Sequence, residues 1–206
     1  MAVTKVARTL GLAGVALAIL LIGVLHVVPP SSQVSAVRRT ISEYALLEDG
    51  WVFNLGVTAL AIGSLAVIVS LVSRAVIKPI SVPSALIAVW SASLLLIVAF
   101  PKNNWAIGPS MGGTVHRTAS VVAFVALPLA AIIVGRMTRN PWPLWLGVLS
   151  FLWFAVILGA VLMQPVTGTR WWLAIPLGAV ERGMLLTEVL AVAALALTPV
   201  RQPLRV

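Results

Sequence analysis

Long uninterrupted apolar stretches are the feature that most restricts how this chain can fold. Of its 206 residues, 61% are hydrophobic and only 9% are charged, whereas soluble domains carry about 25% charged residues. The few polar side chains cannot cover so many apolar ones, which excludes a soluble globular domain. The sequence therefore predicts a protein that lies mostly within a lipid bilayer.

Each apolar stretch is close to the ~20 residues that a helix needs to cross a hydrocarbon core of about 30 Å. Because unpaired backbone groups are costly in lipid and the stretches do not alternate, helices are expected and a β-barrel is not. We predict an all-α bundle, one integral membrane domain over residues 1–206, with six transmembrane helices. Their expected bounds are Thr9–Val28, Trp51–Ser73, Val82–Phe100, Val115–Gly135, Trp142–Met163 and Ala174–Thr198.

The loop Pro29–Gly50 is long enough to contain structure of its own. Its apolar residues recur at helical spacing, at Val34, Val37, Ile41 and Tyr44. This spacing predicts a short amphipathic helix that lies on the outer membrane surface.

The basic residues predict the orientation, because lysine and arginine collect in loops that stay in the cytoplasm. If the N-terminus is cytoplasmic, eight basic residues share the inner side with no acidic neighbour: Lys5, Arg8, Arg74, Lys78, Arg136, Arg139, Arg201 and Arg205. We therefore expect a multi-pass protein of the plasma membrane with both termini in the cytoplasm. Orientation also accounts for the net charge of +9 without a nucleic-acid partner.

Ionisable residues within membrane spans are costly, so they are candidates for function. In this chain most of them fall in the predicted outer half. We expect seven polar residues to converge on one pocket beneath the outer surface: His26, Glu43, Asn54, His116, Arg117, Glu181 and Arg182. The structural alternative for Glu181 is a buried pair with an arginine or histidine. Glu188, two turns further on the same helix face, is expected to be protonated or bonded to a serine or threonine.

Cofactor sites receive little support from the sequence. His26 and His116 at similar depth are compatible with haem ligation or, together with Glu181, with a metal site. The arginines beside His116 and Glu181 disfavour a metal cation, and no ligand spacing occurs within one helix. Cysteine is absent, and no nucleophile or phosphate-loop motif is present. We therefore expect neither a metal nor another cofactor.

Small residues spaced four apart predict close helix packing. They occur at Ala59 and Gly63 in the second span, and as the pairs Ala119–Ala123 and Ala126–Ala130 in the fourth. Such faces allow helices to approach closely in lipid. We expect them to hold a single compact bundle.

Several motifs together resemble a known family. They are Ile41-Ser42-Glu43-Tyr44 running into Asp49-Gly50-Trp51, Phe100-Pro101 followed by Gly113-Thr114-Val115-His116, and Glu181-Arg182-Gly183. Over most of its length the chain resembles the bacterial and archaeal membrane proteins called domain of unknown function 998. The resemblance implies a six-helix membrane protein with a histidine opening the fourth helix and a Glu-Arg pair in the sixth. It implies no established activity.

Three classes of function remain. The leading one is binding of a membrane lipid or other amphiphile, with His116, Arg117 and Arg182 meeting its headgroup. The second is an accessory subunit that docks onto other membrane proteins. The third is a lipid hydrolase or transferase with His116 as general base and Glu181 orienting it. An enzyme is less expected than a binding protein, and a transporter is disfavoured because repeats and paired broken helices are absent.

Overall fold

The computed structural model describes residues 2–104 and 106–199, and this part of the chain contains helices and no strands. Arg201 and Arg205, which support the predicted orientation, lie outside the described residues. The long helices are α1 (Ala2–Leu25), α2 (Gly50–Ser73), α3 (Val82–Ala99), α4 (Met111–Thr138), α5 (Pro141–Thr167) and α7 (Leu177–Leu197). Three short helices complete the set: the 3₁₀ helices η1 (Ser31–Gln33) and η2 (Ile41–Leu46), and α6 (Trp171–Ala174).

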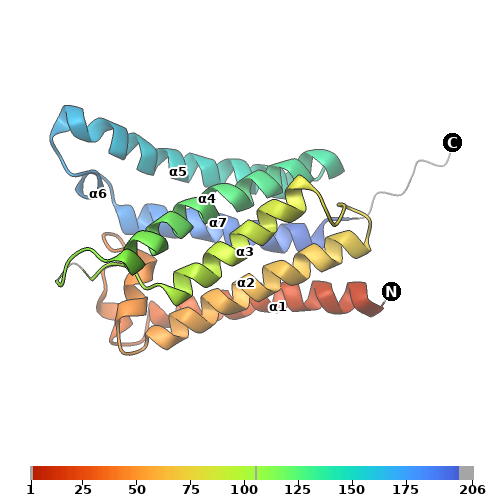
Figure 1. Cartoon of the computed structure of the whole chain (residues 1–206), viewed down its shortest axis with the longest axis horizontal. Helices are drawn as coiled ribbons and strands as arrows, with labels where there is room; N and C mark the ends of the chain where they lie inside the picture. Colours follow the sequence, from red (N-terminus) through yellow and green to blue (C-terminus); the bar gives the residue numbers. More distant parts are fainter. Residues whose placement is uncertain (1, 105, 200–206) are drawn as a thin grey trace.

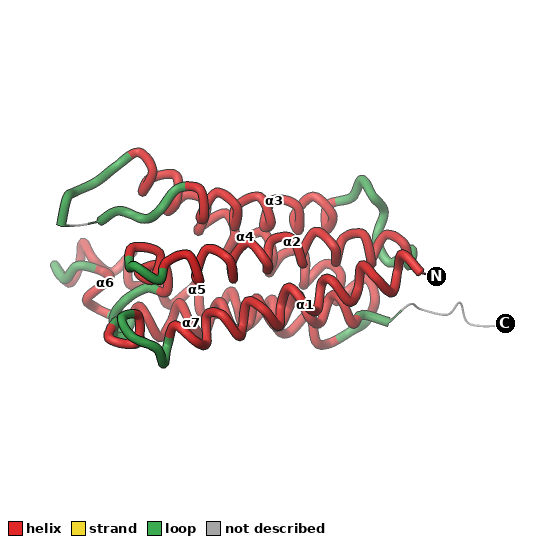
Figure 2. The backbone as a smooth tube through the Cα atoms, turned by 90° about the horizontal axis from the view of Figure 1, so that it is seen from below, coloured by secondary structure: helices red, strands yellow, loops and turns green. Residues whose placement is uncertain are grey.

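The long helices lie side by side in one bundle and alternate in direction (Figure 1). The start of α1 and the end of α7 lie at the same end of the bundle in two perpendicular views (Figures 1 and 2). The opposite end carries the segments 26–49 and 168–176, and we call it the long-loop end.

Five of these helices, α1 to α5, are long and apolar enough to cross a membrane. The sixth long helix, α7, differs because its 21 residues include Glu181, Arg182 and Glu188. The prediction of an all-helical, multi-pass membrane bundle is confirmed in this form.

Packing follows the chain order, and α7 joins the two sides of the bundle. Neighbouring helices pack in the pairs α1–α2, α2–α3, α3–α4 and α4–α5, and α7 contacts α1, α2, α4 and α5. The predicted small faces are buried: Ala119, Ala123, Ala126 and Ala130 of α4 are all at most 4% exposed. On α2, Gly63 lies against Gly14 of α1, where an added Cβ would come within 3.1 Å of the Gly14 Cα.

Two helix boundaries near prolines differ from the predicted spans. The predicted span Ala174–Thr198 is interrupted: Ile175 is extended and α7 begins only after Pro176, since a proline disfavours helical backbone in the residue before it. By contrast, α5 passes through Pro165 and ends at Gly168, whose φ of 66° provides the left-handed C-cap. A proline in this last turn breaks only one helical hydrogen bond.

The predicted amphipathic helix across Val34–Tyr44 is not confirmed. Two separate 3₁₀ helices, η1 and η2, occur within residues 31–46, and residues 34–40 between them are turns and extended chain. Val37, expected on the apolar face, is 53% exposed. The physical reason is that the carbonyl groups of Ala36 and Arg39 accept hydrogen bonds from the Arg182 guanidinium, so this backbone is held in a non-helical conformation.

Candidate ligand cavity

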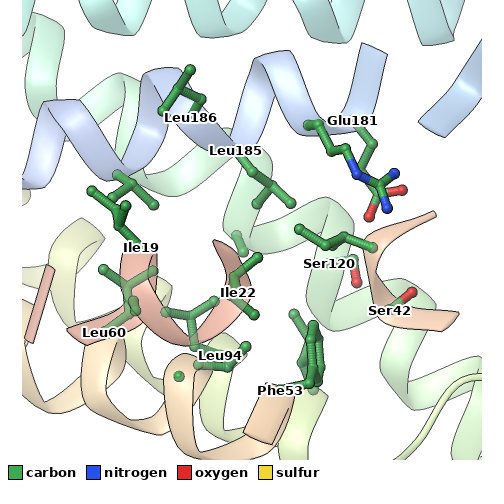
Figure 3. A pocket seen from close by; sticks show the side chains of 18 of the residues that line it. Ile19, Ile22, Ser42, Phe53, Leu60, Leu94, Ser120, Glu181, Leu185 and Leu186 are labelled. Carbon is green, nitrogen blue, oxygen red and sulfur yellow. The ribbon is translucent and has the colours of Figure 1, made fainter. Parts of the chain in front are cut away.

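A cavity of about 320 Å³ lies in the half of the bundle nearest the long-loop end. Its walls come from α1, α2, α3, α4 and α7, and η2 contributes Ile41 and Ser42. Most of the lining side chains are apolar. Figure 3 shows Glu181, Ser42 and Ser120 toward one end of the cavity, with Ile19 and Leu60 toward the other. The cavity therefore has a polar end and an apolar end.

The cavity reaches the side of the bundle between α1 and α7. Ile19 of α1 and Leu186 of α7 both line it, and they are 47% and 54% exposed. Both side chains lie within long apolar helices, away from the loops. The opening is therefore lateral, at the depth of the apolar helix faces.

The structure brings four of the seven predicted site residues to this cavity: His26, His116, Glu181 and Arg182 line its wall. They come from three places: the residue directly after α1, the second turn of α4 and the beginning of α7. These elements meet because α1, α4 and α7 end or begin at the long-loop end of the bundle.

The other three predicted residues do not line the cavity. Glu43 is paired with Lys102, at 2.9 Å between Oε1 and Nζ, and lies 3.8 Å from Arg39. Asn54 is half-buried on α2. Arg117 is exposed and makes no hydrogen bond or ion pair within the described residues. Because it follows His116 directly on a helix, its side chain points about 100° away from that residue, so Arg117 is not placed to meet a ligand in the cavity.

Arg182 of α7 forms hydrogen bonds with the segment 26–49 at the long-loop end. Its Nε donates to His26 Nε2 at 2.8 Å, and its Nη2 donates to the Tyr44 hydroxyl at 3.1 Å. Its Nη1 donates to the carbonyl groups of Ala36, Arg39 and Gly178, at 2.9, 2.7 and 3.1 Å. The guanidinium also lies over the Tyr44 ring, 5.6 Å from its centroid. A guanidinium has five N–H donors, so the protein itself occupies nearly all of its hydrogen-bonding capacity.

Both histidines are oriented by backbone carbonyl groups. His26 Nδ1 donates to the Ile22 carbonyl at 2.7 Å, which leaves Nε2 as the acceptor for Arg182. His116 Nδ1 donates to the Phe100 carbonyl at 2.9 Å. The Phe100 carbonyl group therefore orients His116. A general-base arrangement would require Glu181 to do so. In the neutral His116 ring, Nε2 remains as an unused acceptor.

Glu181 is 8% exposed and lines the cavity, yet it makes no ion pair within the described residues. The structural alternative, a buried Glu–Arg or Glu–His pair, is not formed among the described residues. Consecutive residues on a helix do not face each other, and Arg182 turns toward the loop that it binds. The Glu181 carboxyl is thus a buried ionisable group with no opposite charge in direct contact.

Glu188 confirms the prediction of a hydrogen bond to a serine across a helix. Its Oε1 accepts from Ser150 Oγ of α5 at 2.9 Å, and both residues are fully buried. Its Oε2 has no partner among the described residues. Glu188 does not line the cavity, so it joins α5 to α7 instead of contributing to the site.

Sequence reasoning missed Tyr44 and Gly178, which complete the attachment of the loop. Tyr44 is 1% exposed and packs edge-on against His26, with ring centroids 5.4 Å apart. At Gly178 an added Cβ would collide with the carbonyl oxygens of Ala36 and Arg39. The available signal was spacing, because Gly178 lies four residues before Arg182 and therefore on the same helix face.

In the described part of the chain, the two histidines considered as metal or haem ligands are not joined by further ligands. Within residues 2–104 and 106–199, no three histidine, cysteine or acidic side chains gather closely enough to hold a metal ion. Both ring nitrogens of His26 are engaged by Ile22 and Arg182. His26 therefore has no free nitrogen to offer to an iron or another metal.

Comparison with known proteins identifies the family and adds no activity. No curated protein and no solved structure matches the chain. The family model described as "Protein of unknown function (DUF998)" matches residues 12–198. That range includes the motifs that suggested the resemblance and every residue that lines the cavity. The chain therefore belongs to the DUF998 family.

Proposed function

We propose that this protein crosses the plasma membrane six times and binds a lipid or other amphiphile in the cavity. The proposed spans are α1 to α5 and α7, and the long-loop end faces outward. The single observation that carries the binding proposal is a lateral, mostly apolar cavity that ends in polar groups.

The length and packing of α7 support its assignment as the sixth span. Its 21 residues extend about 31 Å at a rise of about 1.5 Å per residue, close to the ~30 Å of a hydrocarbon core. Its charged residues are sheltered by the protein: Glu181 and Glu188 are 8% and 0% exposed, and Arg182 is held by the loop. Such burial is how ionisable residues are tolerated within membranes.

The proposed orientation rests on the basic residues. Arg74, Lys78, Arg136 and Arg139 follow the ends of α2 and α4 or lie in their last turns. These helix ends lie opposite the long-loop end. The positive-inside rule then places that side, with both termini, in the cytoplasm. We place the loop that contains η1 and η2 at the outer membrane surface.

The shape of the cavity supports an amphiphile as its occupant. Pockets for small molecules start at about 300 Å³ and are mostly apolar with a few polar groups, which matches the volume of about 320 Å³ and the lining. An acyl or alkyl chain enters between Ile19 and Leu186, directly from the membrane. Its headgroup then meets Glu181, His116 and the two serines, Ser42 and Ser120.

Lipid retention tests this function. The full chain is purified in mild detergent, reconstituted in nanodiscs and analysed by native mass spectrometry for bound amphiphile. We expect wild-type protein to retain about one amphiphile per molecule, and Ile22→Trp, which fills the cavity, to lose it. The matched control is Ile62→Trp, on the exposed face of α2 outside the cavity. If the Ile22→Trp protein is folded and retains as much amphiphile as the control, the cavity is not the binding site.

A further inference from the structure

We infer that the cavity selects an amphiphile with a hydrogen-bond-donating, cationic amine headgroup over one with a phosphate headgroup. The inference rests on the proposed binding function and specifies its ligand. It follows from an inventory of the donors and acceptors that the lining residues leave unused.

Most donors at the polar end are already committed; the exception is the Ser42 hydroxyl, which lies 3.3 Å from the Thr40 hydroxyl and can donate or accept. Arg182 donates to His26, to Tyr44 and to three backbone carbonyl groups. His26 donates from Nδ1 to Ile22. Ser120 Oγ donates to the His116 carbonyl at 2.9 Å. A phosphate, which only accepts hydrogen bonds when ionised, finds few free donors here.

The unused capacity consists mainly of acceptors. His116 Nδ1 is bound to Phe100, so the neutral ring offers Nε2 as an acceptor. The Ser120 hydroxyl, having donated its hydrogen, retains its lone pairs. Glu181 adds a buried carboxyl group that receives a backbone hydrogen bond from Ile41 and has no ion-pair partner among the described residues, so it retains further lone pairs. An alkylammonium group has three N–H donors and no acceptor, and these three groups can accept from it.

The charges lead to the same ligand class. Besides the two histidines, the lining residues that can carry a full charge are Glu181 and Arg182, and Arg182 directs its donors at the loop. Lys102, another cation near Glu181, is paired with Glu43 at 2.9 Å and also donates to Thr40. Arg117 lies outside the cavity. Glu181 is therefore the cavity carboxyl group without a cation in contact, and an ammonium group favours its ionised form and pairs with it through a charge-assisted hydrogen bond.

The test compares three probes that share a 12-carbon chain: dodecylamine, dodecanol and dodecyl phosphate. Each is titrated into purified full-length protein in a neutral detergent, and its apparent Kd is measured by isothermal titration calorimetry. We expect dodecylamine to bind most tightly and dodecyl phosphate at least tenfold more weakly. The order among ligands is measured on the wild-type chain and needs no variant.

Two matched variants assign the preference to one carboxyl group. Glu181→Gln should raise the Kd for dodecylamine about tenfold and leave the Kd for dodecanol nearly unchanged. Glu188→Gln makes the same chemical change on the same helix, outside the cavity, and should leave both values unchanged. An equal loss in the two variants would show that the amine senses overall charge and would overturn the inference.

The outcomes also separate this inference from the binding function itself. Equal or tighter binding of dodecyl phosphate, blocked by Ile22→Trp, would overturn the amine preference while the amphiphile site stands. If Ile22→Trp does not weaken the binding of any of the three probes, or if none of them binds, both the amine preference and the proposed function fail.

Discussion

Arg182 decides how the long-loop end is built. Arg182 belongs to α7, and it contacts His26 just after α1, two loop carbonyl groups and Tyr44 on η2. A planar guanidinium presents its donors in several fixed directions, whereas a lysine ammonium presents three donors from one nitrogen. A side chain in this position therefore bonds four residues of the segment 26–49 at once: His26, Ala36, Arg39 and Tyr44.

Replacing Arg182 by lysine should destabilise the protein. Hydrogen bonds to charged groups contribute roughly 1.5–3 kcal/mol each, and lysine cannot reach all of the acceptors. We expect Arg182→Lys to lower the free energy of unfolding by at least about 2 kcal/mol, measured by denaturant titration in mixed micelles. Arg117→Lys, at an exposed arginine on α4, should change it by less than about 0.5 kcal/mol. Equal effects of the two changes would contradict the attachment role of Arg182.

The helices pack through small residues, and α1 and α2 approach closely at Gly14. At Gly14 an added Cβ would lie 2.5 Å from the Ala59 carbonyl oxygen and 2.9 Å from the Gly63 Cα. Ala59 and Gly63 form the small face that the sequence predicts, and Gly14 is the partner that it does not identify. In lipid, such backbone proximity gains van der Waals contact that larger residues prevent.

Gly14→Val should therefore separate α1 from α2. Inserting atoms into a closely packed contact costs about 1–3 kcal/mol, and the nearest atoms here are backbone, which cannot move aside. The control is Gly159→Val on α5, where an added Cβ meets no atom within 4 Å. Both changes carry the same intrinsic helix propensity. The measurement is the thermal unfolding temperature in detergent. An equal decrease in both variants would argue against a close α1–α2 contact.

At the scale of the whole molecule, the two ends of the bundle are organised differently. At the long-loop end, Arg182 binds the segment 26–49. Lys102 donates hydrogen bonds to Thr40 and Glu43 of the same segment. At the other end, Arg74 donates to the carbonyl groups of Ala196 and Thr198 and so caps the end of α7. That capping ties the end of α2 to the end of α7.

Reporter fusions test the topology of the whole chain. Six crossings with cytoplasmic termini predict alternating locations, because each span moves the chain to the other side of the membrane. Fusions at five positions should read out, in, out, in and out: after Gly50, Ile80, Asn103, Asn140 and Gly168. A cytoplasmic signal after Gly50 or Gly168 would reverse the orientation, and an odd number of crossings would remove α7 from the membrane.

The candidate site was only partly predictable. Polar residues near the same end of different spans had to lie at similar depth, which is why His26, His116, Glu181 and Arg182 meet at one cavity. Depth does not determine rotation about the helix axis, and so Arg117 and Asn54 face elsewhere. The loop could not be predicted from its apolar spacing, because the bonds that shape Ala36 and Arg39 come from Arg182, more than 140 residues away in the chain.

The sequence by itself determined three properties: that lipid surrounds most of the chain, that the fold is helical, and roughly where the long helices lie. Apolar runs of membrane length leave the backbone no other way to satisfy its hydrogen bonds in lipid. Only the tertiary structure decided which polar groups remain free. Whether a polar group is free depends on contacts between residues that are distant in the chain. Arg182 donates its hydrogen bonds to a loop, whereas Glu181, the preceding residue, lines the cavity.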